Sequence, residues 1–349
     1  MAPSDVPGLL LVNLGTPAAP RIREVRRYLR EFLSDPRVLD MPGPLRWLML
    51  NALILPFRPR RSAEAYAKIW TESGSPLLVH GRALAEKVQR RLDGRAVVEL
   101  AMRYGEPSIP RALESLVRRG VERIVVFPLY PQVSSAATGS SVEAVAASTS
   151  RFERAPELAV VPPFFDDPRY VACFAENTSA ALREVAPELV FFSFHGLPER
   201  QIRRSDPSGR HCLASADCCE RPPREVLAAC YRAQCFATAR LLADTLGIEP
   251  ERRVVSFQSR LGRTPWIQPF TDVEVREAAR RGVKRAVIVV PSFVADCLET
   301  LEEIGIRAAA DWRAHGGEKL RLVPAPNAGD SWADAVVAIA ANASPWLRT

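Results

Sequence analysis

The chain has 349 residues, 47% of them hydrophobic, so it is long enough for two domains with packed cores. Its 47 Lys and Arg residues outnumber 40 Asp and Glu residues, and the net charge is +7, but the basic residues are scattered along the sequence. This scatter argues against nucleic acid as a partner and leaves an acidic small molecule or an anionic membrane surface.

No segment predicts export or a membrane span. Residues 1–8 lack the charged region that precedes the core of a signal peptide, and the apolar run at 9–12 is too short to be that core. No stretch reaches the ~20 apolar residues of a spanning helix. We therefore expect a cytoplasmic protein, at most peripheral to the inner face of the membrane.

Short apolar runs alternate with longer amphipathic stretches, which predicts strands alternating with helices. The expected strands are, in chain order, 9–14, 97–102, 123–128, 159–163, 190–195, 254–258, 286–291 and 320–324. The expected helices include 82–92, 109–118, 171–185, 235–246, 271–280 and 332–341. This alternation is typical of βαβ units with parallel sheets.

An internal repeat indicates two similar halves. Residues 118–128 resemble residues 280–291, and each copy reads as a helix end, a glycine and a buried strand closing at proline. The sequence therefore predicts an α/β fold with two Rossmann-like, doubly wound lobes and a cleft between them, over residues 1–165 and 166–349. The alternative is that any two helix–glycine–strand junctions look alike.

Two segments interrupt the alternation. Residues 45–57 are apolar almost all round and are followed by Arg58, Arg60 and Arg61. They predict either a buried helix or a hydrophobic lip, so residues 45–61 are a candidate for peripheral membrane contact. Residues 203–235 are rich in Pro, Ser and Cys and are typical of an insertion.

One of the four histidines, His195, closes an expected strand and is followed by Gly196 and Pro198. Ligands of parallel sheets bind at the carboxyl ends of strands, so this imidazole is a candidate for proton transfer near neutral pH. The alternative is a histidine with a purely structural role. No glycine-rich dinucleotide or phosphate-binding loop occurs, which argues against a nucleotide ligand.

Glu299 and Glu303 follow another expected strand with the i, i+4 spacing that places two carboxylates on one helix face. Two like charges there are suited to a cation. The alternative is an acidic helix start that is stabilised by the helix dipole.

The sequence around His195, residues 193–198, resembles the signature of the ferrochelatases, which insert Fe(II) into a porphyrin. The resemblance covers nearly the whole chain. Further similar motifs follow in order at 11–17, 74–77, 103–104, 129–132 with 138–141, 257–260 with 265–266, and 298–301.

The resemblance implies a chelatase-like fold and an enzyme of haem biosynthesis, a lyase, that acts on a porphyrin and ferrous iron. Protoporphyrin IX is the preferred substrate and coproporphyrin the alternative. By matching position it implies His195 and Glu299 as catalytic residues, and it implies His195, Glu299 and Glu303 around the metal. The residues implied around the porphyrin are Leu14, Tyr66, Arg103, Tyr104, Trp266 and Phe293.

A porphyrin loses two pyrrole protons when a metal enters, which requires a base such as His195. The sequence departs from the family at Cys297, where many relatives carry histidine, and at Arg307, where an acid would continue the spacing of Glu299 and Glu303. Two rival functions stay open: a cobalt or nickel chelatase of the same fold, and a porphyrin carrier without catalysis.

Five of the seven cysteines crowd into residues 212–235. Crowded cysteines in a cytosolic protein favour a metal site, and four thiolates can hold an iron–sulfur group. Because some ferrochelatases carry a [2Fe–2S] cluster, we expect one here, held by Cys212, Cys219, Cys230 and Cys235. The alternatives are a zinc site, reduced structural cysteines, or Cys218 as a ligand in place of Cys219.

Overall fold

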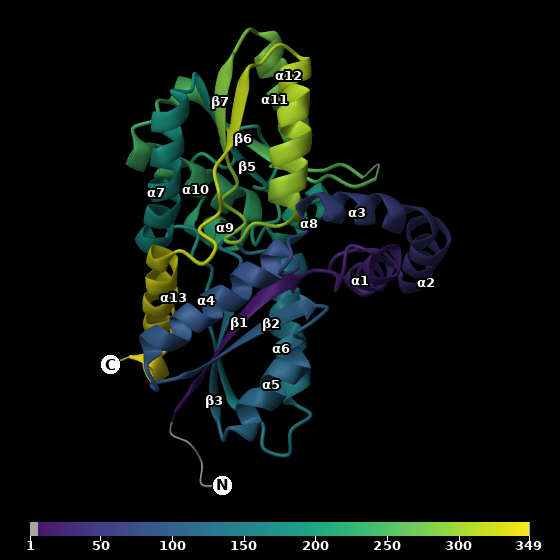
Figure 1. Ribbon diagram of the computed structural model, residues 1–349, viewed down its shortest axis with the longest axis vertical. Coiled ribbons are helices and arrows are strands. Elements are labelled where there is room, and N and C mark those ends of the chain that lie inside the picture. The colour runs from purple at the N-terminus through teal and green to yellow at the C-terminus, as the bar shows by residue number, and fades with distance from the viewer. Residues whose placement is uncertain (1–5, 263, 349) are drawn as a thin grey trace. The chain divides into compact units, whose positions relative to one another are not determined.

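The computed structural model describes residues 6–262 and 264–348, which divide into two compact units. The first unit contains the described residues of Met1–Tyr130, Ser135–Pro162 and Asn327–Thr349. The second contains Pro131–Ser134 and Pro163–Pro326 without residue 263. Figure 1 shows that each unit is built on a sheet with helices packed against it.

The first sheet has the strand order β2-β1-β3-β4, and all of its strand pairs are parallel. Its strands are β1 (Gly8–Gly15), β2 (Val97–Tyr104), β3 (Arg123–Pro128) and β4 (Glu157–Val160). β1 is central and buried on both faces, which explains why its sequence is a continuous apolar run.

The helices of the first unit are α1 (Ile22–Ser34), α2 (Gly43–Leu48), α3 (Leu55–Ile69), α4 (Pro76–Leu92), α5 (Ile109–Arg118), α6 (Ser140–Thr149) and α13 (Asp330–Ala343). Short π-helical turns at Met49–Ile54 and Ser135–Gly139 precede α3 and α6. The buried side chains of α5 (Ile109, Ala112, Leu113 and Leu116) join the strands in one apolar core.

The second sheet repeats this plan with the order β6-β5-β7-β8, again all parallel. Its strands are β5 (Leu189–His195), β6 (Arg253–Gln258), β7 (Arg285–Val289) and β8 (Lys319–Leu322). The two copies of the sequence repeat form α5 with β3 and α11 (Thr271–Arg280) with β7. Because β3 and β7 occupy the same position in their sheets, the prediction of two similar α/β halves is confirmed.

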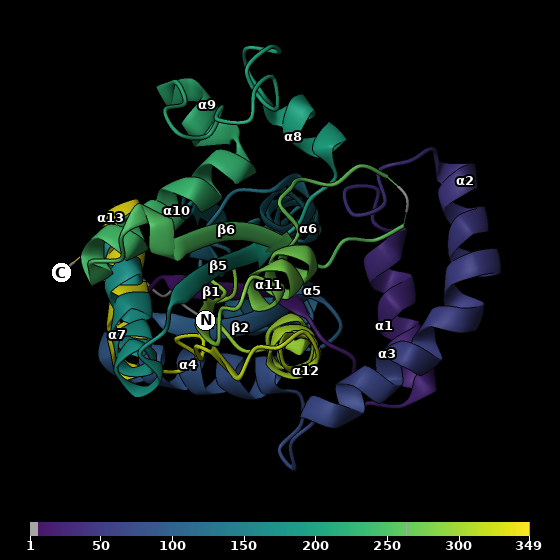
Figure 2. The ribbon, with the colours of Figure 1, turned by 90° about the horizontal axis from the view of Figure 1, so that it is seen from above.

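The other helices of the second unit are α7 (Pro168–Val185), α8 (Glu199–Ser205), α9 (Arg224–Ala229), α10 (Tyr231–Leu246) and α12 (Ala309–Ala314). A π-helix, Glu299–Ala308, runs directly into α12. In Figure 2, α8, α9 and the chain between them lie at the periphery of this unit, beyond α10.

The division of the chain differs from the predicted domains at the C-terminal end, because α13 belongs to the first unit. Asp330 in the first turn of α13 is ion-paired at 3.0 Å to both Lys87 and Arg91 of α4. Arg91 also binds Asp334 one turn further on. A sequence split at half-length has no means of detecting contacts between helices so far apart in the chain.

The apolar segment 45–57 forms α2, the first π-helical turn and the start of α3. None of the residues of α2 is buried. Two large side chains of the segment 45–57 are exposed: Trp47 at 67% and Phe57 at 72%. None of the helices in the described part of the chain is long and apolar enough to cross a membrane.

Candidate functional site

His195 is the last residue of β5, at the carboxyl end of the second sheet. Its backbone N–H donates to Ser292 Oγ at 3.0 Å, and its carbonyl accepts a hydrogen bond from the Tyr231 hydroxyl at 2.8 Å. Two neighbouring elements therefore fix the backbone of His195, while its half-buried ring stays accessible.

The imidazole Nδ1 of His195 lies 2.6 Å from the carbonyl oxygen of Gly196. A carbonyl can only accept, so Nδ1 carries the proton and Nε2 keeps its lone pair. Gly196 is required because a Cβ there would lie 2.8 Å from the Gln258 carbonyl oxygen and 3.3 Å from the Trp266 ring. The close packing of this turn thus sets the tautomer of the histidine.

Glu299 and Glu303 are on the π-helix Glu299–Ala308, where the sequence predicted an ordinary α-helix. A π-helix bonds each residue to the fifth one along, so residues four apart still share a face. Glu299 raises the pKa of Glu303 and His195 lowers it, so the two carboxyls and the imidazole share one electrostatic environment.

Burial is the largest influence on Glu303 and raises its pKa, although the hydrogen bond from the Ser259 hydroxyl and the charge of Arg307 oppose the shift. Glu303 accepts from the Ser259 N–H at 2.9 Å and from its hydroxyl at 2.6 Å. Ser259 has a φ of +67°, a strained conformation for a non-glycine residue. The two hydrogen bonds to Glu303 help to hold Ser259 in this conformation.

Aromatic side chains lie around His195 in the second unit. The ring of Phe293 is 6.3 Å from the imidazole, centroid to centroid. Trp266 lies against Gly196 and donates its indole N–H to the Leu261 carbonyl at 2.9 Å. Phe293 and Trp266, which the sequence predicted around the substrate, are thus placed beside the histidine within one unit.

In the first unit, Arg103 and Tyr104 end β2 and bind Asp35, the residue that ends α1. Asp35 Oδ2 accepts from Arg103 Nη2 and from the Tyr104 hydroxyl, both at 2.8 Å, and from Ser140 Oγ at 2.5 Å. Tyr104 is only 1% exposed, so its hydroxyl serves this internal network, whereas the Arg103 side chain stays 22% exposed.

Burial alone would raise the pKa of Asp35. The hydrogen bonds from Ser140, the Arg37 backbone and Tyr104, together with the charge of Arg103, hold it below its ordinary value. The network thus ties β2 to the segment that leads from α1 to the apolar lip, residues 45–57.

The remaining residues predicted to contact substrate are also in the first unit. Leu14 is half-buried near the carboxyl end of β1. Tyr66 is buried on α3, and its ring makes an edge contact with Trp70 at 6.1 Å.

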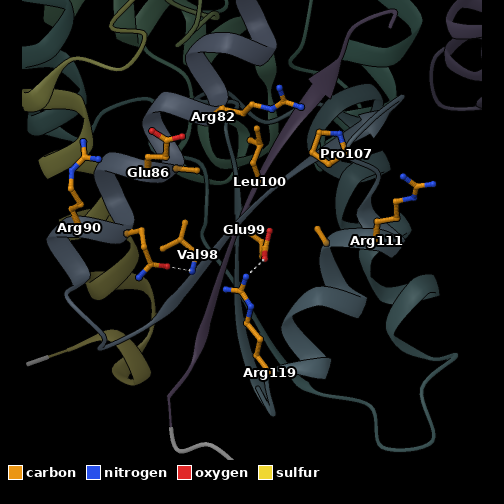
Figure 3. Close-up of a pocket in the computed structure, with 12 residues that line it drawn as sticks. Arg82, Glu86, Arg90, Val98, Glu99, Leu100, Pro107, Arg111 and Arg119 are labelled. Atoms are coloured by element: carbon orange, nitrogen blue, oxygen red, sulfur yellow. Dashed lines mark hydrogen bonds and ion pairs between the residues drawn. The ribbon is translucent and has the colours of Figure 1, made fainter.

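An open groove of about 650 Å³ runs along the outer edge of β2 between α4 and α5 (Figure 3). Its floor includes Glu99, which is ion-paired to Arg119 at 3.4 Å. The groove follows the middle of β2 and contains none of the predicted site residues, whereas Arg103 lies at the carboxyl end of the strand. It is separate from the candidate site.

The cysteine-rich segment brings four buried thiols together. The Sγ atoms of Cys218 and Cys219 are 3.7 Å apart, and Cys230 shares hydrogen bonds with Cys212 and Cys219. Asp206 positions the loop, because its carboxylate accepts from the N–H groups of Ser208, His211 and Cys212.

Cys235 faces a different environment from the other four thiols. It is fully buried on α10, where its thiol is hydrogen-bonded to Tyr231 and interacts with Tyr170. Cys235 also interacts with Cys230, while Cys218, which the predicted ligand set left out, lies next to Cys219. Over the described residues, no three His, Cys, Asp or Glu side chains converge closely enough to hold a metal ion.

Several site residues escaped the sequence reasoning. Gln258 donates to the Glu299 carbonyl at 2.8 Å, and the Cys297 thiol is hydrogen-bonded to Glu299. Arg307, noted only as a departure, is ion-paired to Glu302 at 2.8 Å. Gln258 ends an expected strand and Ser259 follows it directly, and that position was the available signal for them.

The same chain topology occurs in a solved metal chelatase. The crystal structure of the sirohydrochlorin chelatase SirB from Bacillus subtilis subspecies spizizenii, in complex with cobalt, aligns with a TM-score of 0.56 at 12% identity. The alignment covers 97% of this chain and 96% of that one. The fold is therefore that of the metal chelatases.

Sequence comparison narrows this class. The ferrochelatase family model matches residues 6–344. A ferrochelatase of Azotobacter vinelandii is 50% identical over 332 residues, which cover 94% of this chain and 96% of the relative. One of Pseudomonas fluorescens is 46% identical, covering 95% and 96%, and one of Coxiella burnetii (strain Dugway 5J108-111) is 45% identical, covering 95% and 92%. The chain belongs to the ferrochelatase family.

Proposed function

We propose that the protein is a haem-synthesising lyase that inserts Fe(II) into a porphyrin, with His195 as the base that takes up the pyrrole protons. The observation that carries this assignment is the contact between His195 Nδ1 and the Gly196 carbonyl. In the tautomer that this contact favours, Nε2 is the proton acceptor, at the carboxyl end of the sheet where parallel sheets bind their ligands.

Insertion exchanges two N–H bonds of the macrocycle for bonds from its nitrogens to iron. Nε2 of His195 accepts the protons in turn and passes each to water before the next arrives. The Tyr231 and Ser292 bonds to the histidine backbone keep the ring in place during these transfers. Positioning of this kind contributes directly to the rate of proton transfer.

Glu299 and Glu303 are the carboxylates that receive the ferrous ion as substrate. Burial, and to a smaller extent the charge of Glu299, raise the pKa of Glu303, so a second negative charge there costs free energy. A divalent cation removes that cost. Arg307 lies 3.8 Å from Glu303 and already binds Glu302, so the acidic row ends at Glu303.

The macrocycle is an apolar disc with carboxylates at its rim. In the second unit, Phe293 and Trp266 provide apolar surface of the kind that the disc needs. In the first unit, taken by itself, the half-buried Leu14 provides apolar surface and the Arg103 guanidinium provides a charge of the kind that a propionate needs. Tyr66 and Tyr104 support this surface from within their unit, since both are buried. The preferred substrate is protoporphyrin IX, and coproporphyrin is the alternative.

One assay separates the candidate activities. The purified protein is given Fe(II), Co(II) or Ni(II) with a dicarboxylic or a tetracarboxylic porphyrin, and the metalloporphyrin product is followed by its visible spectrum. Faster insertion of Fe(II) into the dicarboxylic porphyrin supports the assignment. Faster insertion of cobalt or nickel would contradict it, and porphyrin binding without insertion of any metal would indicate a carrier.

We also propose that the cysteine segment holds a [2Fe–2S] cluster through Cys212, Cys218, Cys219 and Cys230. Two sulfurs on one tetrahedral metal, each about 2.3 Å from it, lie about 3.8 Å apart. The 3.7 Å between Cys218 and Cys219 agrees with this spacing. Thiols are the usual ligands of such a cluster, but no three of them converge in the described residues, so the loop would have to close around the group. A bound cluster would supply one-electron redox chemistry.

Anaerobic purification tests the cluster and its ligand set. The protein should be coloured and contain about two irons and two sulfides per chain. Cys218→Ser should bleach it, while Cys235→Ser and the matched control Cys173→Ser on α7 should keep the colour. Bleaching by Cys235→Ser instead of Cys218→Ser would restore the ligand set predicted from sequence. A colourless protein with one zinc would replace the cluster by a zinc site.

The exposed apolar residues of 45–61 are proposed to contact the inner face of the cytoplasmic membrane. Trp47, Leu53 and Phe57 are each more than 60% exposed, and Arg61 lies close to them in sequence. Aromatic rings beside arginines are typical of helices at a lipid surface. Arg46 is less available, because it donates to the Met41 carbonyl at 3.1 Å.

Vesicle flotation tests this contact. The protein should float with vesicles that contain anionic phospholipid, and Trp47→Glu combined with Phe57→Glu should abolish the flotation. Leu241→Glu is the matched control, since Leu241 is an exposed apolar residue on α10. Flotation that survives the double substitution would contradict the proposal.

A further inference from the structure

Gln258, the last residue of β6, is a buried amide that links the two elements on which the site residues of the second unit lie. The residue is 4% exposed. Its Oε1 accepts from the Ser193 hydroxyl of β5 at 2.7 Å, and its Nε2 donates to the backbone carbonyl of Glu299 at 2.8 Å. One side chain therefore connects the strand that ends at His195 with the first turn of the π-helix.

The backbone of Gln258 also holds the turn that follows His195. The two residues are register partners in the parallel pair of β5 and β6, and the Gln258 carbonyl accepts from the Gly196 N–H at 2.8 Å. The Gly196 carbonyl is in turn the acceptor for His195 Nδ1. A substitution of the Gln258 side chain removes the contact with Glu299 and leaves these backbone contacts in place.

A row of three buried hydroxyls fixes the orientation of the amide. Ser193, Thr271 and Ser256 are each at most 2% exposed, and their oxygens follow one another at 2.7 and 2.9 Å. The Glu299 carbonyl only accepts, so the amide nitrogen faces it, and Oε1 takes the one proton of Ser193. Thr271 must then donate to Ser193, and Ser256 to Thr271. The donors therefore run in one direction, from Ser256 to the Glu299 carbonyl.

Other contacts on the first turn of the π-helix have different targets. The Thr300 hydroxyl binds this turn to the segment just before it. Ser259 also reaches the π-helix from the end of β6, but it holds the carboxylate of Glu303, four residues further on. Gln258 joins the strands to the backbone of Glu299 itself.

We propose that Gln258 is a positioning residue for metal insertion, which sets the place of the Glu299 carboxylate relative to His195. The inference rests on the proposed function, in which Glu299 receives the ferrous ion and His195 takes up the protons. A misplacement of reacting groups by about 1 Å can lower a rate on the order of 10²-fold while the groups themselves are unchanged. Without the amide, the Glu299 backbone loses a donor and Ser193 loses its acceptor, so the first turn of the π-helix can shift away from β6.

The test compares Gln258→Leu, Ser193→Ala and Ser256→Ala with wild type in the full chain. Ser256→Ala is the matched control, since Ser256 lies in the same buried row but at the end away from Glu299. Each substitution is also made in the Glu299→Gln background, which completes a double-mutant cycle. Insertion over a range of Fe(II) concentrations, porphyrin binding by fluorescence quenching, and the Tm are measured for each. The assays are run well below the lowest Tm.

Gln258→Leu should lower kcat/KM for Fe(II) on the order of 10-fold and Ser193→Ala about 3-fold, while Ser256→Ala and porphyrin binding should change less than about 2-fold. In the Glu299→Gln background, Gln258→Leu should cost less than about 2-fold, because the carboxylate that it positions is absent. A purely structural glutamine would lower the Tm without this dependence on Glu299. If Gln258→Leu does not fold, the serine variants decide, and a loss for Ser193→Ala no larger than that for Ser256→Ala would overturn the role.

Equal losses from Gln258→Leu in the two backgrounds would overturn the positioning role and leave the proposed function intact. An unchanged kcat/KM in folded Gln258→Leu would do the same. A wild-type protein that inserts no metal, or Glu299→Gln with the wild-type rate, would overturn the proposed function of the site and this inference together.

Discussion

The two sheets have the same topology, but the charged residues at their carboxyl ends differ: they are paired with opposite charges in one sheet and lie near like charges in the other. In the first unit, Arg103 at the end of β2 is neutralised by Asp35. In the second, the acids that follow β7 repel each other, and the pKa of Glu303 is raised. One half of the repeat thus uses its polar residues for stability, while the other keeps an unfavourable arrangement that a cation can relieve.

The largest expected effect is on the rate of metal insertion, for a substitution in the second unit. His195→Ala should lower the rate of ferrous insertion on the order of 10²- to 10⁴-fold, because the base is removed. Porphyrin binding, followed by fluorescence quenching, should change only a few-fold. His315→Ala is the matched control, since that histidine lies after α12 and its ring nitrogen is bonded to the Asp311 carbonyl. Turnover of His195→Ala near the wild-type rate would remove the histidine from the mechanism.

The two acids should differ in importance. Glu299→Gln should reduce insertion on the order of 10²-fold and Glu303→Gln on the order of 10-fold, because Glu299 is closer to the strand end. Steady-state assays over a range of Fe(II) concentrations measure both. Equal losses, or a larger loss for Glu303→Gln, would contradict the greater importance assigned to Glu299.

A substitution in the first unit should change the free energy of unfolding. Asp35→Asn should cost about 2 kcal/mol at pH 7, because it leaves Arg103 without its counter-charge. Asp35 has a lowered pKa, so its contribution is present above the ordinary carboxyl value and is lost as the pH falls through the folded value. Urea unfolding at pH 7 and pH 3 measures this, with the exposed Asp93→Asn as control. Equal costs at both pH values would contradict the charged role.

The smallest expected effect has the opposite sign, because a substitution in the second unit should increase the free energy of unfolding. The folded pKa of Glu303 is raised, so wild type loses stability as the pH rises through that value, at about 1.4 kcal/mol per pKa unit. Glu303→Gln should therefore be more stable than wild type at pH 8 and equal to it at pH 4. Thermal unfolding across this pH range is the measurement. A variant that is less stable than wild type at every pH would show that the charged Glu303 carboxylate does not destabilise the fold.

Periodicity and strand-end logic were sufficient for the fold and for the position of His195 at the end of β5, because both depend on local sequence. They give no account of contacts that long-range packing decides. Tyr104 reads as a strand-end hydroxyl, but Asp35 from a distant helix draws it into the core. Cys235 reads as one more crowded thiol, but the turn of α10 directs it to Tyr231, so Cys218 joins the group instead. The π-helix at Glu299 also has no signature in residue spacing.

The return of α13 to the first unit has a consequence for biosynthesis. The second unit is nearly contiguous in sequence, whereas the first needs Asn327 onward to be complete. On the ribosome, β1 to β4 therefore emerge long before the helix that binds Lys87 and Arg91. The first unit is therefore translated first but completed last. The surface that α13 covers stays exposed while the second unit folds.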